Sequence, residues 1–386
     1  MAARRTHRLL PLVCVVLAVL SVRGQVPQTV PGIDEILRPV RTQFAPDRRL
    51  AVFDITAEQT AQGLVVKGEV ERADARDAVL QALRAAGHAQ LLDQVAVLPD
   101  PALGPATTGL VRVSVANVKS KPSHPAEMAT QAVMGWTVSV LKKQSGWYYV
   151  HTEPDHYLGW IEELQLALVT SEVARAWAGA PRVVVTGPIA YVRERPAADA
   201  IPVTDAVMGS LVKRLDEQAG WIHVELPDGR QGYLRAEEAA DYDGWKASRQ
   251  PTPDNVEKAA QVFMGVPYLW GGTSSKGFDC SGFAKTVLRM NGIELTRDTD
   301  QQAQAGSAVP IDESLSQFRK GDLLFFGTRA TADRPERISH VGIFVGNGEF
   351  LHASGLVRRN SLLPASPIYS ESLRQRLLRV RRVLPQ

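Results

Sequence analysis

The stretch YLWGGTSSKGFDCSGFAKTVLRMNGI, residues 268–293, contains Cys280, the only cysteine beyond the first few residues of the chain. Glycines before the cysteine indicate a loop, whereas the apolar residues of 283–288 are spaced as one face of a helix that ends at an Asn-Gly pair. The pattern predicts Cys280 at a helix N-terminus, with Asp279 as its cap. Unpaired N–H groups and the helix dipole favour negative charge there, so we expect a lowered thiol pKa.

Two histidines downstream, His340 and His352, are candidates for the base that a thiol nucleophile requires near neutral pH. They lie on strand-like runs joined by residues 346–348, Gly-Asn-Gly. A two-residue turn would point them to opposite faces, whereas a three-residue loop ending in a left-handed glycine places them on one face. The sequence predicts the three-residue loop, with Val345 opposite Glu349, so that His352 orients the imidazole of His340.

Cys280, His340 and His352 also have structural interpretations. A free cysteine is often buried and inert, and a single strand histidine is more often a core side chain than a base. Two histidines on one face, together with a capped thiol, favour catalysis. Zinc is the competing use, but one cysteine and two histidines supply at most three ligands and lack the paired spacing of structural sites. We therefore expect neither a metal nor a cofactor.

Residues 1–24 have the pattern of a secretory signal peptide, because arginines precede an apolar run from Leu9 to Leu20 and small residues follow up to Gly24. The run is shorter than the roughly 20 residues of a membrane span. Cys14 lies inside the run and not at its end, which argues against a lipoprotein. We expect an exported chain, periplasmic or extracellular, without stable membrane insertion and with Cys280 as its single thiol.

The charge of the chain is close to balance, with 44 basic and 41 acidic residues among 386 and a net charge of +3. This balance gives no reason to expect a nucleic-acid partner. A hydrophobic content of 45% and a charged content of 22% are typical of soluble globular protein, and the length predicts two to four domains. We expect a monomer, although the sequence does not determine the oligomeric state.

Residues 27–100 predict a small α+β domain that carries no constellation of chemically active residues. The expected elements are a helix at 33–44, strands at 50–55 and 63–70, a helix at about 75–86 capped by Asp74, and a strand at 94–98. The order helix, strand, strand, helix, strand resembles a BON-type domain. Three prolines between 99 and 105 mark the linker that follows.

An internal repeat follows the linker, with an offset of 73 or 74 residues. The repeated pieces are AVMG at 132–135 and 206–209, Gly-Trp at 146–147 and 220–221, and PDHYLGWI from Pro154 against PDGRQGYL from Pro227. Short strands and glycine turns predict two all-β units, at about 109–168 and 182–242, which resemble bacterial SH3-like domains. The first copy has His156-Tyr157 in place of an ordinary turn, which puts an aromatic residue on a loop.

A second proline-containing linker precedes the final domain, residues 250–386, which opens with a helix expected at 254–264. The pieces YLWGG, DCSG, GDLLFF and SHVGIFVGNGEFLHAS, in this order and spacing, are similar to the NlpC-type papain-like cysteine peptidases of bacterial cell walls. The tandem SH3-like domains narrow the resemblance, over about 109–386, to γ-D-glutamyl-L-diamino acid endopeptidases that cut peptidoglycan stem peptides. The expected fold is therefore multidomain α+β: a papain-like domain after two SH3-like barrels and a BON-like domain.

The resemblance implies Cys280 as nucleophile, His340 as base and His352 as the residue that orients it, in agreement with the assignment made from the residues. It also implies a substrate pocket. The residues expected to contact substrate there are Tyr157, Trp270, Asp279, Ser281, Asp298 and Thr299.

Within that pocket, the resemblance implies that Trp270 forms a wall and that Asp298 pairs with the free α-amine of the L-alanine end of a stem peptide. Thr299 stands where the family often has serine, and Tyr157 would close one end of the cleft. A buried carboxylate without its cation is costly, so peptides still linked to glycan should be rejected. Asp298 and Tyr157 also have a plainer interpretation as solvated loop residues.

Two other functions fit the same sequence. One is a non-catalytic peptidoglycan-binding protein in which the last domain is a relic, although the intact cysteine and histidines argue against it. The other is a broader wall hydrolase that accepts the intact sacculus. The sequence leaves open the preferred diamino acid, the biological role and the function of the N-terminal domain, and also the role of the charged loop at 328–337, just before His340.

Overall fold

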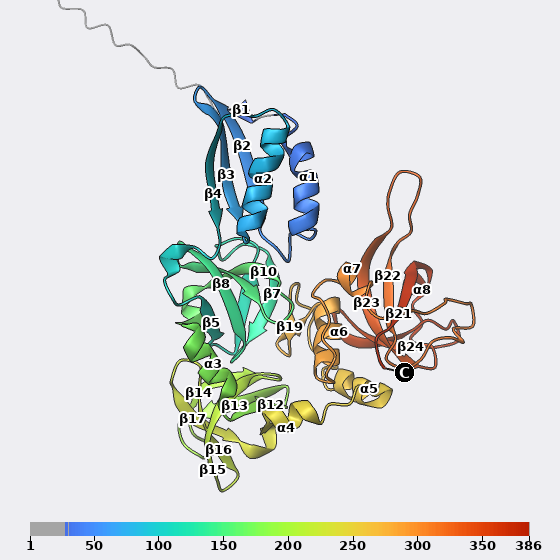
Figure 1. Ribbon diagram of the computed structural model, residues 1–386. Helices are drawn as coiled ribbons and strands as arrows, with labels where there is room; N and C mark the ends of the chain where they lie inside the picture. Colours follow the sequence, from blue (N-terminus) through green and yellow to red (C-terminus); the bar gives the residue numbers. More distant parts are fainter. Residues whose placement is uncertain (1–27, 30, 386) are drawn as a thin grey trace, which may run out of the picture.

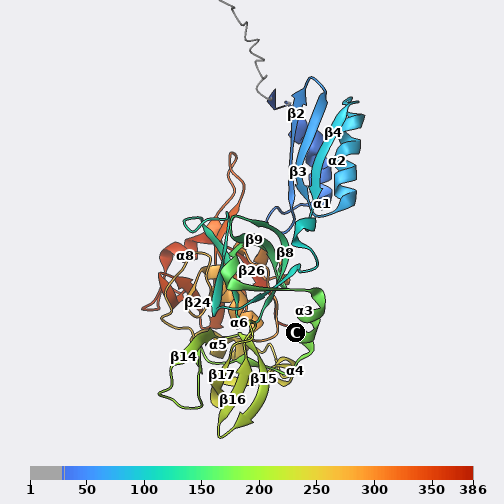
Figure 2. The same cartoon turned by 90° about the vertical axis from the view of Figure 1, so that its left-hand side faces the viewer.

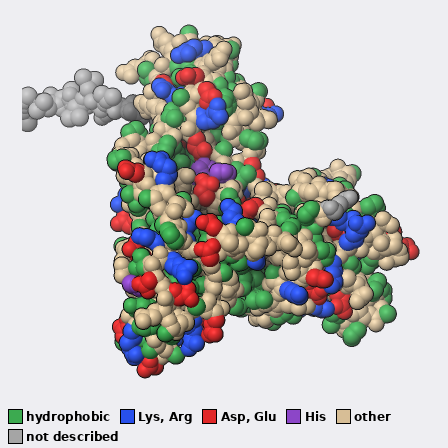
Figure 3. Space-filling view, turned by 60° about the horizontal axis from the view of Figure 1, so that its bottom comes forward, with side chains coloured by type: hydrophobic (Ala, Val, Ile, Leu, Met, Phe, Trp, Pro, Cys, Tyr) green, Lys and Arg blue, Asp and Glu red, His purple; other side chains and the backbone are tan. Residues whose placement is uncertain are grey.

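The computed structural model describes residues 28, 29 and 31–385, which form four successive units (Figure 1). Three units stack in a column, and the C-terminal unit packs beside the middle of that column (Figure 1). Figure 2 gives the same arrangement from the side. Acidic and basic side chains are interspersed over the face drawn in Figure 3. The predicted signal peptide lies outside the described residues, among which no helix is both long and apolar enough to cross a bilayer.

The N-terminal unit is a four-stranded sheet, in the order β1-β2-β3-β4, with two helices against one face (Figure 2). Its elements are β1 (Gln28–Thr29), α1 (Ile33–Phe44), β2 (Phe53–Thr60), β3 (Gly63–Val70), α2 (Ala73–Ala85) and β4 (Leu91–Val97). The predicted order helix, strand, strand, helix, strand is confirmed for α1, β2, β3, α2 and β4. Both helices bury their apolar faces in the core of the unit, with Leu37 of α1 and Leu83 of α2 fully buried. The predicted cap was wrong: Arg72 holds that position, and Asp74 lies in the first turn.

Two seven-stranded β-units follow the N-terminal unit. The first has η1 (Pro101–Leu103), β5 (Thr108–Val111), β6 (Val115–Lys119), β7 (Met128–Val133), β8 (Thr137–Gln144), β9 (Trp147–Thr152), β10 (Leu158–Glu162), η2 (Glu163–Gln165) and β11 (Leu166–Val169). After α3 (Ser171–Gly179), the second has β12 (Arg182–Val185), β13 (Ile189–Arg193), β14 (Pro202–Val207), β15 (Leu211–Gln218), β16 (Trp221–Glu225), β17 (Gln231–Arg235), η3 (Ala236–Glu238) and β18 (Ala239–Asp241).

The internal repeat is confirmed at the level of strand pairing. The first sheet has the order β7-β6-β10-β9-β8-β5-β11, and the second has β14-β13-β17-β16-β15-β12-β18, which matches it strand for strand. Even the irregularities repeat, since the bulge at Val118/Lys119 recurs at Val192/Arg193. A conserved offset of bulges means that the two copies bend their strands in the same way.

The C-terminal unit packs helices against one six-stranded sheet of order β21-β26-β22-β23-β24-β25. Its elements, after α4 (Tyr242–Ala247), are α5 (Pro253–Gln261), β19 (Thr273–Ser274), β20 (Gly277–Phe278), α6 (Cys280–Arg289), α7 (Thr299–Gln302), β21 (Ser307–Ala308), β22 (Leu323–Thr328), β23 (Arg337–Gly346), β24 (Glu349–Ser354), β25 (Leu356–Ser361), α8 (Glu371–Arg376) and β26 (Leu377–Arg382). Phe283 and Val287 of α6 are fully buried against Val341 and neighbouring residues of the sheet. This packing fixes the start of α6 beside β23.

The turn between β23 and β24 differs from the predicted three-residue loop. Asn347-Gly348 form a two-residue turn with φ of 51° and 73°, and Gly346 rather than Val345 pairs with Glu349. Asn-Gly fits the two left-handed positions of a tight hairpin turn. The extra residue, Val345, is absorbed as a bulge in β23.

Candidate active site

Cys280 is the first residue of α6, as predicted, and Asp279 caps the helix by accepting a hydrogen bond from the Gly282 N–H at 2.7 Å. Gly282 is required because a Cβ there would lie 2.0 Å from the Gly272 carbonyl oxygen. The glycine loop therefore packs directly on the helix start. Cys280 is 7% exposed and lines a cavity of ≈ 760 Å³.

The pKa of the Cys280 thiol is raised, contrary to the prediction of a lowered one. Burial is the main cause, because it removes the hydration that a thiolate needs, and the neighbouring Asp279 carboxylate adds repulsion. Contacts with the Thr299 hydroxyl, 3.7 Å from the sulfur, and with the Val341 N–H oppose this effect but are weaker. The thiol is therefore protonated at neutral pH.

Asp279 and Ser281 line the cavity, but their polar atoms bind other parts of the protein. Arg297, which is fully buried, donates to the Asp279 carboxylate and, at 2.9 Å, to the Ser281 hydroxyl. Its Nε also donates to Thr130 Oγ1 of the first β-unit at 3.0 Å. Arg297 directly precedes Asp298 in the sequence, yet the sequence pattern alone did not indicate this bracing role.

The two histidines meet on one face of the sheet, as predicted, because the bulge in β23 shifts the pairing by the one residue that the longer loop would have added. His340 Nε2 lies 2.7 Å from His352 Nδ1, and His352 Nε2 lies 2.9 Å from Asn360 Oδ1. The Asn360 amide donates to the Ile368 carbonyl, so its oxygen faces His352 and accepts. This series of hydrogen bonds places protons on Nε2 of both histidines and leaves His340 Nδ1 unprotonated.

Burial lowers the pKa of His340 to about 3 and that of His352 to about 4. Charge on His352 would lower the pKa of His340 further, as do the nearby Arg376 and Arg358. Both imidazoles are therefore neutral at neutral pH. The N–H of Val341, the residue after His340, contacts the Cys280 thiol, so the neutral imidazole of this strand is the candidate acceptor of the thiol proton.

Asp298 and Tyr157 line the same cavity as Cys280. Tyr157 lies just before β10, is 8% exposed and donates its hydroxyl to Asp298 Oδ2 at 3.0 Å. Asp298 caps α7 in a capping box with Gln301. Neither residue is a solvated loop side chain. A residue that the sequence analysis did not predict also contacts this carboxylate: Arg49 of the N-terminal unit, whose Nη1 donates to Asp298 Oδ2 at 2.8 Å.

The cavity is lined by residues from three units, including Arg49 of the N-terminal unit. Trp270 is 63% exposed, lines the cavity and donates its Nε1–H to Glu127 of the first β-unit at 2.7 Å. The charged segment 328–337 forms an exposed hairpin that projects from the C-terminal unit (Figure 1), and Glu336 and Arg337 at its base line the cavity. Sequence reasoning missed Glu127 as well as Arg49, because no local motif marks either residue.

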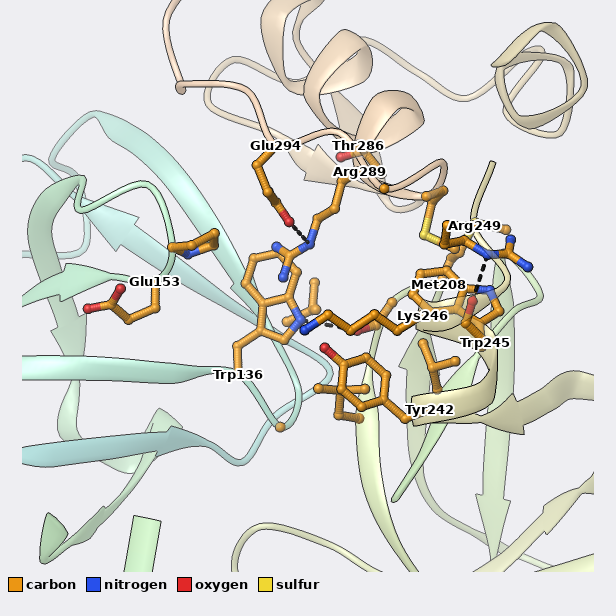
Figure 4. Close-up of a pocket in the computed structure, with 18 of the residues that line it drawn as sticks. Trp136, Glu153, Met208, Tyr242, Trp245, Lys246, Arg249, Thr286, Arg289 and Glu294 are labelled. Atoms are coloured by element: carbon orange, nitrogen blue, oxygen red, sulfur yellow. Dashed lines mark hydrogen bonds and ion pairs between the residues drawn. The ribbon is translucent and has the colours of Figure 1, made fainter. Parts of the chain in front are cut away.

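A second cavity, of ≈ 600 Å³, lies between the two β-units and the C-terminal unit (Figure 4). Its walls include Trp136, Tyr242 and Trp245, and the Arg289 guanidinium lies 3.4 Å from the centre of the Trp136 ring. None of the predicted site residues lines it. Within residues 28, 29 and 31–385, there is also no group of three or more His, Cys, Asp or Glu side chains suited to a metal ion.

A buried cysteine at a helix start lines a cavity, and the N–H of Val341, next to His340, contacts its thiol. Together with the paired histidines, this arrangement is typical of thiol hydrolases. Comparison with known proteins is more specific. Residues 265–382 match the family model described as NlpC/P60 family, and residues 119–166 match the one described as bacterial dipeptidyl-peptidase Sh3 domain.

Among curated proteins, a γ-D-glutamyl-L-lysine dipeptidyl-peptidase of Bacillus cereus is 31% identical over 253 residues, which cover 64% of this chain and 73% of that protein. The protein of the same name from Bacillus subtilis is 30% identical, covering 58% and 71%. A crystal structure of an NlpC/P60 family protein from Bacillus cereus matches with a TM-score of 0.60 and 26% identity, covering 72% of this chain and 100% of that one. This chain belongs to the NlpC/P60 family and is a cysteine peptidase.

Proposed function

We propose that this peptidase hydrolyses the bond between D-glutamate and the L-diamino acid of peptidoglycan stem peptides, with preference for peptides that begin with a free L-alanine amine. One observation carries the proposal: a single cavity of ≈ 760 Å³ holds the Cys280 thiol and also the Asp298 carboxylate with its Tyr157 partner. The relatives named γ-D-glutamyl-L-lysine dipeptidyl-peptidases support the substrate class.

In the proposed reaction, the Cys280 sulfur attacks the carbonyl carbon of the γ-glutamyl bond while Nδ1 of His340 accepts the thiol proton. The imidazolium then gives this proton to the departing amine of the diamino acid, which leaves a thioester on Cys280. His340 next removes a proton from water, which hydrolyses the thioester and frees the thiol. His352 accepts the hydrogen bond from His340 throughout and stabilises the imidazolium.

The proposed oxyanion site is the start of α6, where backbone N–H groups have no intrahelical partner. The Asp279 side chain takes the Gly282 N–H. The N–H groups before it are thus the donors available to the oxygen of the tetrahedral intermediate. Asp279 and Ser281 then act by bracing this turn through Arg297, and not by holding substrate.

The raised thiol pKa and the lowered imidazole pKa indicate that Cys280 and His340 are uncharged before substrate binds. Proton transfer then accompanies attack instead of preceding it. In this role His340 acts as a general base through Nδ1, and the hydrogen bonds to His352 and from His352 to Asn360 fix its tautomer.

At the other end, the Asp298 carboxylate would pair with the substrate ammonium, and Tyr157 would limit the length of chain that fits beyond it. Thr299 and Trp270 would line the path between this end and the thiol. A peptide whose amine is acylated could not form this ion pair with Asp298, and the excess negative charge of Asp298 and its neighbours would stay uncompensated in a partly buried site.

We extend the proposal to the remaining units. The second β-unit is a second SH3-like domain, supported by the strand order and bulges that it shares with the first. The N-terminal unit is BON-like, supported by its helix and strand order. The chain acts as a monomer on cell-envelope peptides after export to the periplasm or beyond.

The deciding experiment compares hydrolysis of L-Ala-γ-D-Glu-diamino-acid tripeptide with that of its N-acetylated form, for the mature chain and the Cys280→Ser variant. We expect cutting of the free-amine peptide only, and none by the variant. Equal cutting of both peptides would indicate the broader hydrolase that accepts intact sacculus. No cutting of either would indicate a peptidoglycan-binding protein without this activity.

A further inference from the structure

Arg49 belongs to the loop between α1 and β2, in a unit that lies outside the matched family regions, yet its side chain lines the cavity of Cys280. We infer that Arg49 is a positioning residue that determines specificity: it holds the Asp298 carboxylate in place for the ammonium group of the substrate. The inference rests on the proposed function, because it assigns a further residue to the same amine pocket.

The guanidinium of Arg49 binds three carboxylates. Its Nη1 donates to Asp298 Oδ2 at 2.8 Å and to Asp300 Oδ1 at 2.9 Å. Its Nη2 donates to Asp300 Oδ2 at 2.9 Å and to Asp47 Oδ2 at 2.7 Å, and its Nε donates to Asp47 as well. The side chains of Arg49 and Asp298 are 30% and 26% exposed, so this network lies at the cavity wall and not in open solvent.

The charges of this network decide what it can bind. Three carboxylates surround one guanidinium, so the network has an excess of negative charge even with Arg49 in place. A substrate ammonium can therefore join it without expelling Arg49. Asp298 receives donors from three parts of the chain: Arg49 of the N-terminal unit, Tyr157 of the first β-unit and the backbone of Gln301 in α7. These donors fix the direction in which the carboxylate faces.

The segment that carries Arg49 is itself firmly held. The Arg49 carbonyl accepts a hydrogen bond from the N–H of Leu158, the residue after Tyr157, at 2.8 Å. Beside it, Val52 packs with Leu158 and two further leucines in a buried cluster that joins the N-terminal unit to the first β-unit. His151 and Glu71 add an ion pair across the same interface at 2.8 Å.

Arg49 therefore forms part of the pocket wall and is not a flexible plug. Two consequences follow for the substrate. An ammonium group finds a carboxylate that is already oriented, so less ordering is needed on binding. A peptide acylated at its amine has no positive charge to offer and meets a guanidinium at that end instead.

The test compares Arg49→Ala with Arg48→Ala, a matched control, because Arg48 is the exposed neighbour and has no ion pair within the described residues. Steady-state kinetics are measured on the free-amine tripeptide and its N-acetylated form. We expect Arg49→Ala to raise KM for the free-amine peptide about tenfold, the usual effect of losing a hydrogen bond to a charged group. The kcat should stay within about twofold and the preference for the free amine should narrow, whereas Arg48→Ala should behave as the unmodified protein.

Arg49→Lys keeps the positive charge and the aliphatic part of the side chain but loses the planar guanidinium with its several donors. Compared with Arg49→Ala, it should recover part of the affinity for the free-amine peptide. If Arg49→Ala lowers the melting temperature, this lysine variant decides the matter with the same kinetic readout. An unchanged KM and preference in both variants would overturn the inference. A lower KM would also overturn it, because Arg49 would then be competing with the ammonium.

The Asp298→Asn variant separates this inference from the proposed function. If it abolishes the preference for the free amine while the Arg49 variants do not, the amine pocket stands and the role of Arg49 is wrong. If it retains the preference, the proposed amine pocket itself is wrong.

Discussion

The two β-units share one strand order and the same bulges, but only the first contributes to the cavity of Cys280. Residues 120 and 127–129 of the first unit line this cavity, and so does one residue of the turn before β10. In the first unit the turn before β10 is Pro-Asp-His-Tyr and ends in Tyr157; in the second it is Pro-Asp-Gly-Arg and ends in Arg230. The third residue is left-handed in both, with φ of 53° at His156 and 83° at Gly229.

Side chains at this one position face different partners. Tyr157 reaches Asp298 in the C-terminal unit, whereas Arg230 binds Asp228 of its own turn and the Arg112 carbonyl of the first unit. The comparison shows that the same position of the repeated unit carries different contacts: in the first unit it lines the cavity, and in the second it joins the two β-units.

The largest expected effect comes from exchanging the two turns. Replacing His156-Tyr157 with Gly-Arg puts a cation beside Arg49 and removes the hydroxyl from Asp298, while Asp155 keeps its buried pair with Lys285. We expect kcat/KM for the free-amine tripeptide to fall by about 100-fold or more, since like charges in a partly buried site repel.

The reverse exchange, Gly229-Arg230 to His-Tyr in the second unit, is the matched control. It should leave the kinetic constants within about twofold. Equal losses from both exchanges would show that the turns affect docking of the units and that Tyr157 has no special role.

The next effect concerns how each unit holds the hairpin of β19 and β20. Buried Gln131 of the first unit accepts hydrogen bonds from the Thr273 N–H and the Ser274 hydroxyl, both at 3.0 Å. At the equivalent position of the second unit, Asp205 makes an ion pair with the partly exposed Lys276 at 2.7 Å. Gln131→Ala leaves a buried N–H unpaired, so we expect the free energy of unfolding to fall by about 1–3 kcal/mol.

Asp205→Ala should lower the free energy of unfolding by less than about 1 kcal/mol, as is usual for exposed ion pairs. Denaturation of each variant, followed by tryptophan fluorescence, measures the difference. A larger loss from Asp205→Ala than from Gln131→Ala would show that the second unit, and not the first, contributes more to holding the β19–β20 hairpin.

A smaller effect is expected for Tyr157→Phe, which removes one hydroxyl and keeps the ring. Asp298 retains Arg49 and the α7 backbone as donors, so KM for the free-amine peptide should rise by only a few-fold to about tenfold. The kcat should not change, because the hydroxyl donates to Asp298 and not to Cys280 or the histidines. A fall in kcat alone would assign Tyr157 to the reaction and not to amine binding.

The smallest effect is a pH dependence at the interface between the N-terminal unit and the first β-unit. Burial lowers the pKa of His151, but the Glu71 carboxylate and the His156 carbonyl outweigh it, so the pKa is raised above 6.5. A raised pKa in the folded state contributes stability that is complete below pH 6.5 and is lost as pH rises through the folded value.

We therefore expect the melting temperature to decline modestly from about pH 6 to about pH 8.5, with a shallower decline in His151→Gln. Differential scanning calorimetry at both pH values measures this. Parallel declines in the two proteins would show that His151 does not carry the dependence.

Local features of the site were predictable because they depend on spacing along the chain. The 3.6-residue spacing after Cys280 located the helix start, and the number of residues between His340 and His352 located their common face. The latter prediction succeeded although its loop was wrong, because a bulge in β23 supplied the same shift of register. Strand alternation depends on the total count of residues, and not on where the extra one lies.

Features that depend on contact between units were not predictable. The raised pKa of Cys280 comes from burial, which no local pattern reports. Arg49 lies 249 positions from Asp298, in a region without a recognised chemical motif. Such a contact depends on how whole units dock, and the sequence around either residue contains no pattern that indicates it.

The residues of the cavity are far apart in the sequence and are therefore synthesised at different times. Arg49 and Tyr157 precede Cys280, and both histidines follow it. Asp298, which Arg49 and Tyr157 contact, also follows Cys280. Since domains generally fold as they emerge during synthesis, N-terminal first, the two donors to this carboxylate are in place before the carboxylate itself is made. Neither the proposed amine pocket nor the thiol and histidine site is complete until the C-terminal unit has been synthesised and folded.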